Sequence, residues 1–260
     1  MAKVLDAFDI GMVYMPDVTA NTKTFEKMLD VIEEKEIPVK RAKAGVTVLN
    51  ADGVTATLLA PVSDEYSDMN DYSAVLRIEY GKRAFMFMGD ATTVSEGEIR
   101  GKINCDVVKV GHHGSSSSSG EAFVLATGAD YAVFSVGEDN DYGHPHKESL
   151  DRWKNSGAKI LRTDIDGNIV VSTDGEQMSV RTRNGIISGS VEIGGNTMQP
   201  ADTSQEAYNW VLNTNSKKIH KEDCSSVKDM SEKNKEFSRK SIEELEKDGY
   251  SPCGICKPEK

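Results

Sequence analysis

The sequence is poor in the residue types that define several protein classes. It has four cysteines, two tryptophans and five histidines in 260 residues. Three cysteines lie near the C-terminus and Cys105 stands alone, which is not the even spacing of a disulfide scaffold. No apolar run approaches the ~20 residues that cross a bilayer, and the chain does not open with a signal-peptide pattern. We therefore expect no membrane segment in this chain and a use of cysteine other than disulfide bonding.

The charge is strongly negative and unevenly distributed. The net charge is −11. Residues 217–260 hold 11 basic and 10 acidic side chains, so the 20 basic and 32 acidic side chains of the remainder give it a net charge of −12. Such an acidic body repels phosphate backbones at long range. Any attraction for a nucleic acid must therefore come from metal ions or from a local basic patch.

The apolar pattern predicts an α/β domain over residues 1–185, a linker over 186–206 and a separate unit over 207–260. Gly, Ser and Thr dominate the linker segment. Within the first domain we expect strands at 45–49, 54–60, 73–79, 84–88, 106–110, 131–136, 159–162, 168–172 and 177–183, and helices at 21–36, 94–99, 145–155 and from a Ser118/Glu121 capping box to Gly128. The run Phe85–Met88 predicts a strand buried on both faces, and Cys105 a position in or near the core.

The histidines give the first chemical clue. Four of the five lie between His112 and His146, each in a loop just after a predicted strand, and Asp90 follows a strand in the same way. Strand ends are where α/β folds gather functional groups. Imidazole and carboxylate ligands suit zinc or manganese, which activate water. The alternative is that Asp90 caps a turn and the histidines bond within their loops, but the clustering favours a metal site.

Three segments resemble the late motifs of metallo-β-lactamase domains of the ComEC type. They are Met88-Gly-Asp-Ala91, Val108-Lys-Val-Gly-His-His-Gly-Ser115 and Asn140-Asp-Tyr-Gly-His-Pro-His146. Asn70-Asp-Tyr-Ser-Ala-Val-Leu76 and Thr163-Asp-Ile-Asp-Gly-Asn-Ile169 are similar to further segments of that family. The resemblance covers residues 1–185 and implies an α/β fold, the metallo-β-lactamase αββα sandwich.

The resemblance also implies roles for these residues. Asp90 would bridge two metal ions, either Zn²⁺ or Mn²⁺, and His112 or His113 would bind the second of them. Adjacent strand residues point to opposite sides, so we expect one histidine of this pair to be a ligand. His144 would be a ligand or a donor to developing negative charge, and His146 and Asn140 are weaker candidates.

The principal metal motif of that fold, His-x-His-x-Asp-His, is absent, because no histidine precedes His112. The resemblance therefore implies a domain that lacks its N-terminal part and an incomplete two-metal site. Two or three ligands do not fix an open, water-activating metal ion. We expect little hydrolase activity from this chain alone, and an exposed sheet face where the missing strands would pack.

The C-terminal segment carries a second, independent pattern: His220-x₃-Cys224, then Cys253-x₂-Cys256. These spacings predict a tetrahedral Cys₃His zinc site, closed and therefore structural. The alternative is a Cys253–Cys256 disulfide. The segment resembles the metal-binding module of the Ada family, with His220 in place of a cysteine. A unit of about 50 residues has a small core, so zinc should contribute much of its folding free energy.

Two functional hypotheses follow. The first is a metal-dependent hydrolase domain that acts on phosphodiesters, with DNA or another nucleic acid, or a smaller phosphoester, as substrate; the choice of DNA rests on the resemblance. The second is a non-catalytic DNA- or partner-binding protein held together by a structural zinc. Lysines of the C-terminal unit offer a surface for nucleic acid, and the interleaved acidic residues favour an ordinary solvated surface equally.

Overall fold

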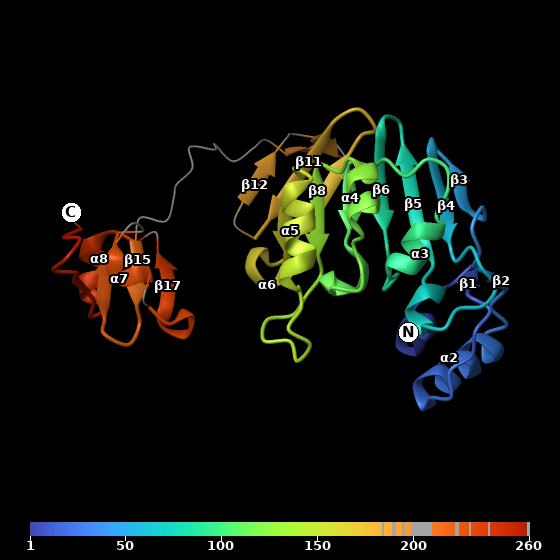
Figure 1. Ribbon diagram of the computed structural model, residues 1–260, viewed down its shortest axis with the longest axis horizontal. Helices are drawn as coiled ribbons and strands as arrows, with labels where there is room; N and C mark the ends of the chain where they lie inside the picture. Colours follow the sequence, from blue (N-terminus) through green and yellow to red (C-terminus); the bar gives the residue numbers. More distant parts are fainter. Residues whose placement is uncertain are drawn as a thin grey trace. The chain divides into compact units, whose positions relative to one another are not determined.

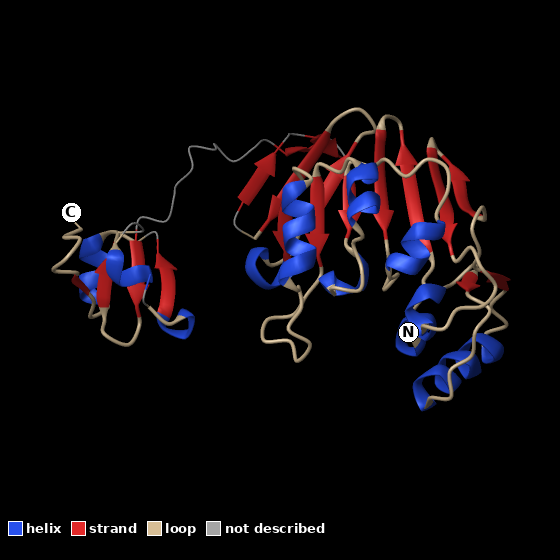
Figure 2. Cartoon of the chain, in the orientation of Figure 1, coloured by secondary structure: helices blue, strands red, loops and turns tan. Residues whose placement is uncertain are grey.

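The chain folds into two compact units, Met1–Pro200 and Ala201–Lys260. The computed structural model describes residues 1–183, 185–188, 191–193, 196–198, 210–221, 224–228, 230–238 and 240–258. Both units mix helices and strands (Figure 2). Among the described residues, no helix is both long and apolar enough to cross a membrane.

A seven-stranded sheet organises the N-terminal unit (Figure 1), with strand order β3-β4-β5-β6-β7-β8-β9. Strands β3 to β6 form an antiparallel meander, and β6 to β9 run parallel to one another. Parallel neighbours need crossover connections, which helices α3, α4 and α5 provide in part. The bounds are β3 (Thr47–Ala51), β4 (Val54–Ala60), β5 (Val75–Tyr80), β6 (Arg83–Phe87), α3 (Thr93–Glu98), β7 (Val107–Lys109), α4 (Glu121–Thr127), β8 (Tyr131–Phe134), α5 (Lys147–Asn155) and β9 (Lys159–Arg162).

The three helices cover one face of this sheet (Figure 1). Met86, Val108 and Phe134 project from three successive parallel strands into one core, where Phe123 of α4 and Trp153 of α5 join them. Met86, Val108, Phe134 and Trp153 are each at most 1% exposed. Side chains alternate across a strand, so this face takes every second residue. The core fixes the strands and thereby the loops that follow them.

The opposite face of the sheet is only partly covered. Phe87 is 42% exposed, so the expectation that Phe85–Met88 is buried on both faces was wrong. Met86 and Met88 face the helices and are buried, whereas Phe85 and Phe87 face the other way. There they line an apolar pocket with Val107 and other residues. An apolar run alone does not reveal whether a second layer covers its far side.

Smaller elements flank the large sheet. A two-stranded parallel sheet and two helices pack around Leu5, Ile32 and Ile37. The expected helix 21–36 is confirmed as α2, which begins after the Thr22 cap. The bounds are α1 (Ala2–Ala7), β1 (Val13–Met15), α2 (Lys23–Glu34), β2 (Val39–Arg41), the 3₁₀ helices η1 (Met69–Tyr72) and η2 (Gly111–Gly114), α6 (Thr163–Asp166), β10 (Val170–Thr173), β11 (Met178–Thr182), β12 (Gly185–Ser188), β13 (Val191–Ile193) and β14 (Asn196–Met198).

The segment predicted as a linker contains strands. β12 pairs with β11, and Tyr131 of β8 contacts Ser188 through a hydroxyl–hydroxyl bond of 2.5 Å. β13 and β14 pair with each other. Ladder bonds join backbone groups whatever the side chains are, so the Gly/Ser/Thr composition misled the prediction over these residues. The rest of the predicted linker, residues 189–190, 194–195 and 199–206, lies outside the described residues.

The C-terminal unit is built on a four-stranded sheet with order β17-β15-β16-β18. Helix α8 places Ile242 and Leu245 against Leu212 and Ile219, which form the small buried core. A capping box of Ser241 and Glu244 begins that helix. The bounds are β15 (Trp210–Asn213), β16 (Lys218–His220), α7 (Ser225–Lys228), η3 (Glu232–Asn234), β17 (Lys235–Ser238), α8 (Ile242–Lys247) and β18 (Ser251–Pro252).

Candidate metal centres

The parallel strands deliver the predicted site residues to one edge of the large sheet. Phe87 at the end of β6 lies beside Lys109 at the end of β7, and Lys109 lies beside Val133 of β8. The segments that follow carry Asp90, the two adjacent histidines and the loop to His146. Because the carboxyl ends of parallel strands share an edge, these segments converge there.

Asp90 and His113 meet at this edge. The Nε2 atom of His113 lies 3.5 Å from an Asp90 carboxylate oxygen. The Nδ1 atom of His113 lies 2.6 Å from the carbonyl oxygen of Ser135. A carbonyl only accepts, so Nδ1 carries the proton and donates it. In the neutral ring the Nε2 lone pair then faces the carboxylate, and a cation between these two acceptors would satisfy both.

The other histidine rings surround His144. Its ring centroid lies 4.8 Å from that of His146, 5.6 Å from that of His112 and 6.5 Å from that of His113. Burial lowers the pKa of His144, and the three neighbouring imidazoles lower it further. A neutral imidazole is the form that binds metal ions. The structure therefore brings all four predicted histidines and Asp90 to one place.

The two adjacent histidines do not lie in a strand. β7 ends at Lys109, and His112 and His113 both adopt left-handed backbone angles, with φ of 46° and 54°. The argument that they point to opposite sides of a strand was therefore wrong. Left-handed backbone at a non-glycine residue costs about 1–2 kcal/mol, and such conformations cluster at functional sites. Gly114 closes this turn: a Cβ there would lie 2.6 Å from Phe134.

Two buried carboxylates brace the loops of the cluster. Asp71, 2% exposed, accepts hydrogen bonds from the backbone N–H and hydroxyl of Thr92 and from Ser95 N–H. Glu96, 5% exposed, accepts from Ser119 N–H at 2.6 Å and Gly120 N–H at 2.7 Å. Burial raises the pKa of Glu96, and the two backbone donors oppose that rise. Sequence reasoning missed both carboxylates, because only the fold brings their partners near.

The predicted capping box before Gly128 does not form. The N-cap of α4 is Gly120, and Glu96 from α3 binds its N–H instead. The hydroxyl of Ser118 donates to the carbonyl oxygens of Gly111 and Ser115. Ser118 thus holds the histidine turn rather than the helix. A distant carboxylate took the capping role that the local sequence pattern assigned to a serine.

Further polar contacts fix the ligand-bearing segments. Ser73 accepts the backbone N–H of Asp90 at 3.0 Å, and His146 Nδ1 accepts the N–H of Ser116 at 2.9 Å. The Asn140 side chain bonds both the N–H and the carbonyl of His144. Asn140 therefore orients the backbone at His144. Asn140, a weaker candidate for the site, thus has a contact that supports the loop.

Lys109 is a half-buried cation at the same edge that sequence reasoning did not single out. Its Nζ donates to the carbonyl oxygens of Val110 at 3.1 Å and Gly89 at 3.4 Å. Burial lowers its pKa, and the charge of Asp90 opposes that shift. A positive group here would favour the binding of an anionic ligand at this edge.

An open pocket of about 440 Å³ adjoins the cluster. His113 and His144 lie in its wall, with Asn140 and the ring of Tyr142, which is 78% exposed and stacks on His144 at 5.7 Å. The pocket thus gives a small molecule or one end of a larger one access to two of the imidazoles.

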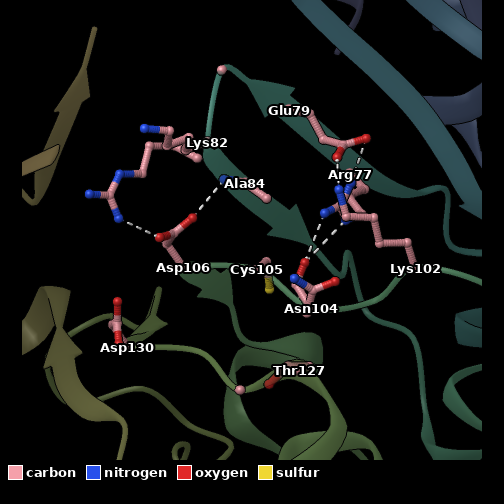
Figure 3. Close-up of a pocket in the computed structure, with 13 residues that line it drawn as sticks. Arg77, Glu79, Lys82, Ala84, Lys102, Asn104, Cys105, Asp106, Thr127 and Asp130 are labelled. Carbon is pink, nitrogen blue, oxygen red and sulfur yellow. Dashed lines mark hydrogen bonds and ion pairs between the residues drawn. The ribbon is translucent and has the colours of Figure 1, made fainter. Parts of the chain in front are cut away.

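A second pocket lies at the opposite, amino-terminal edge of the parallel strands (Figure 3). Several of its charged groups form ion pairs: Arg77 with Glu79 at 2.7 Å, and Arg83 with Asp106 at 2.8 Å. Cys105 is buried beside them, as expected for a near-core residue, and burial raises the pKa of its thiol to about 12. This pocket therefore offers no reactive thiol.

The four predicted C-terminal ligands also come together. One ligand atom from each of His220, Cys224, Cys253 and Cys256 lies within 4.8 Å of the others, and all four cysteines of the chain are free thiols. The Cys253–Cys256 disulfide is therefore not formed. His220 Nδ1 lies 3.4 Å from Cys224 Sγ. His220 leaves its buried Nε2 without a hydrogen-bond partner among the described residues.

Backbone donors support the cysteine pair. Ile255 N–H lies 3.4 Å from Cys253 Sγ, and Lys221 N–H lies 3.4 Å from Cys256 Sγ. Three sulfur atoms and one imidazole nitrogen in this proximity suit a tetrahedral zinc ion. This donor set can hold one metal ion with no open position.

The two units thus define a mixed α/β protein with an Asp/His cluster at a sheet edge and a His/Cys cluster near its C-terminus. No protein-family model matches the chain. The chain is similar to ComE operon protein 3 of Bacillus subtilis, with 33% identity over 55% of this chain and 19% of that protein. It is 38% identical to competence protein ComA of Neisseria gonorrhoeae over 45% of this chain and 17% of that protein.

A third relative is recombination protein 2 of Haemophilus influenzae, 27% identical over 50% of this chain and 16% of that protein. The chain therefore spans less than a fifth of the length of the curated relatives it matches. These homologues are competence proteins of the ComEC type. The resemblance found in the sequence is confirmed at this level.

Proposed function

We propose that the N-terminal unit is a metal-dependent hydrolase domain with a metallo-β-lactamase αββα fold that is incomplete at its N-terminus, acting on phosphodiesters such as DNA. One observation carries the proposal: Asp90 and His113 meet at 3.5 Å, with three further imidazoles around them. The competence and recombination functions named in the relatives support DNA as the phosphodiester.

Zn²⁺ or Mn²⁺ at this edge would lower the pKa of a bound water and polarise a phosphoryl oxygen. Asp90 is the bridging carboxylate in this proposal, and His113 offers the Nε2 lone pair that its bond to Ser135 leaves free. His144 is a further ligand or a donor to the developing phosphate charge. His112 is the other candidate of the adjacent pair, with its Nδ1 3.4 Å from Ser117 Oγ.

The ligand supply limits what this chain does alone. No histidine precedes His112, and the Asp90 and His113 side chains are 44% and 46% exposed. A catalytic zinc site uses three protein ligands and an ordered surrounding shell. We therefore propose that the two-metal site is incomplete in this chain and that hydrolase activity is low or absent without further ligands.

One observation favours a second candidate function, a non-catalytic DNA- or partner-binding protein. Within the described residues, His220, Cys224, Cys253 and Cys256 form a group of potential metal ligands. One ligand atom from each lies within 4.8 Å of the others. We propose that this set holds a structural zinc and that the C-terminal unit is an Ada-like module. Four protein ligands leave no position for substrate.

Metal stoichiometry separates the two functions. The chain should be purified, dialysed against Zn²⁺ or Mn²⁺, and analysed for bound metal by mass spectrometry and for turnover of a phosphodiester. The hydrolase proposal expects metal beyond one ion per chain, with the excess lost in Asp90→Ala. About one zinc per chain, lost in Cys253→Ser and kept in Asp90→Ala, would support the second function. Turnover that Asp90→Ala abolishes would show the site to be complete.

A further inference from the structure

Lys109 carries a positive charge beside the Asp/His cluster, where a metal ion would also bring positive charge. Its Nζ atom donates to the carbonyl oxygen of Gly89, the residue before Asp90, at 3.4 Å. Like charges repel, so Lys109 opposes the binding of a cation at Asp90. In the part of the chain that the structure describes, no carboxylate lies within ion-pair distance of this lysine. A negatively charged ligand would relieve the repulsion.

The register of the sheet places Lys109 on the open face of the parallel strands. Phe87, Lys109 and Val133 form one row across β6, β7 and β8. Val108, the preceding residue, is buried in the core that the helices cover. Neighbouring residues of a strand point to opposite faces, so Lys109 projects from the face that the helices leave uncovered, in the last position of β7.

The hydrogen bonds of Lys109 hold its ammonium group at the carboxyl edge. A lysine ammonium group has three N–H donors. Among the described residues it uses two of them, on the carbonyl oxygens of Val110 at 3.1 Å and Gly89 at 3.4 Å. The Gly89 carbonyl oxygen also accepts the N–H of His112 at 3.1 Å. The ammonium group is therefore fixed between the turn before Asp90 and the turn that carries the histidines, with one donor left for a ligand.

Ser135 connects Lys109 with the imidazoles. Lys109 and Ser135 both line the apolar pocket of about 370 Å³ on the open face. Ser135 and His113 both line the open pocket beside the histidine cluster, and the carbonyl oxygen of Ser135 accepts the His113 Nδ1 proton. The two pockets therefore adjoin at Ser135, and one small anion at this point can meet the lysine on one side and the Asp/His cluster on the other.

We propose that Lys109 is a substrate-binding residue of the proposed hydrolase, and that its remaining N–H binds a phosphoryl oxygen of the phosphodiester beside Asp90 and His113. Lysine binds phosphoryl groups as a point charge. Bound there, the anion would lie between two positive charges and offset their repulsion. The inference deepens the proposed function and rests on it.

The test compares Lys109→Met, which removes the charge, with Lys109→Arg, which keeps it, in the full chain loaded with Mn²⁺. Binding of radiolabelled inorganic phosphate is measured by equilibrium dialysis, and bis(p-nitrophenyl) phosphate is then added as a competing diester. Lys109→Met should weaken phosphate binding by about tenfold or more, and Lys109→Arg should weaken it less. Lys159→Met removes an exposed lysine at the start of β9, the opposite edge of the sheet, and should stay within about twofold of the parent.

The affinity for Mn²⁺ separates ligand binding from mere support of the turns. Removal of a positive charge beside a cation site leaves metal binding unchanged or strengthens it, so Lys109→Met should bind Mn²⁺ at least as tightly as the parent. Equal weakening of phosphate and Mn²⁺ binding would show that Lys109 only supports the turns, and would overturn the inference. If Lys109→Met does not fold, Lys109→Gln replaces it, because its amide can still donate to a carbonyl oxygen without a charge.

Dialysis with a chelator distinguishes failure of the inference from failure of the proposed function. Phosphate binding that requires Mn²⁺ but not Lys109 would overturn the inference and leave the hydrolase proposal standing. Phosphate binding that requires Lys109 but not Mn²⁺ would support the anion site and count against metal-dependent hydrolysis. A parent chain that binds no phosphate, or whose phosphate the diester does not displace, would overturn the inference as well.

Discussion

The two ligand clusters of this chain are built on opposite principles. The Asp/His cluster lies on loops that follow strands of a large sheet, whose core holds fully buried residues such as Met86 and Phe134. The His/Cys cluster lies in a unit whose hydrophobic core is Leu212, Ile219, Ile242 and Leu245. A large core keeps loops in place without a metal ion, whereas a small unit needs one. The proposed hydrolase site can therefore stay open, whereas the proposed zinc site uses four protein ligands and is closed.

The largest expected effect is the loss of the C-terminal fold in Cys253→Ser. Zinc supplies about 10–16 kcal/mol of apparent folding free energy in small zinc modules, so the unit should unfold while the N-terminal unit stays folded. Zinc content and the fluorescence of Trp210 measure this. Cys105→Ala, which removes a buried cysteine of the other unit, should leave the zinc content unchanged. A C-terminal unit that stays folded after zinc removal would contradict the claim that its small core depends on a metal ion.

Met86→Ala should instead lower the free energy of unfolding of the N-terminal unit. Met86 is fully buried, and such truncations cost about 2–5 kcal/mol. Urea unfolding, followed by the fluorescence of Trp153, should show this loss equally with and without a chelator. A chelator that destabilises the N-terminal unit of the unsubstituted chain would mean that its loops also depend on metal.

Glu96→Ala tests the brace between α3 and the histidine loop. It leaves two backbone donors, of the buried Ser119 and the half-buried Gly120, without their acceptor. An unsatisfied buried group costs about 1–3 kcal/mol, so thermal unfolding of the N-terminal unit should shift by several degrees. Glu121→Ala, at an exposed position in the first turn of α4, serves as the control, with a change within about 0.5 kcal/mol. Equal stability of the two variants would argue against the brace.

The smallest expected change in stability is that of Asp90→Asn. Its side chain is 44% exposed, so the free energy of unfolding should change by less than about 0.5 kcal/mol. Binding of Mn²⁺ at the sheet edge, followed by magnetic resonance relaxation of water, should weaken instead. A large loss of stability would identify Asp90 as a structural residue rather than a ligand.

Local patterns predicted most of the secondary structure. Alternation of apolar residues gave the strands of the large sheet, and the Thr22 cap marks the start of α2. Prediction failed where a distant residue decided the outcome. Glu96 capped α4 in place of Ser118, and β11 recruited β12 from a segment with the composition of a linker. Ladder and cap bonds form between whichever groups the fold brings together.

The candidate sites were predictable to different degrees. The spacing of His220, Cys224, Cys253 and Cys256 was sufficient, because thiolate and imidazole ligands at such intervals have few other uses. The Asp90 and histidine cluster was predicted as a set. Its left-handed turn and its support from Asp71, Glu96 and Lys109 were not predictable, since the sequence does not show which backbone groups lie near these side chains.

The sequence by itself determined which residues are candidate ligands and which of them follow strands that end at a common edge, because ligand type and strand periodicity are local properties. Only the tertiary structure decided how those groups are oriented. The tautomer of His113 and the braces at its loop depend on contacts between residues far apart in the chain. Hydrogen bonds and charges act over a few ångströms of space, and a linear sequence does not contain those distances.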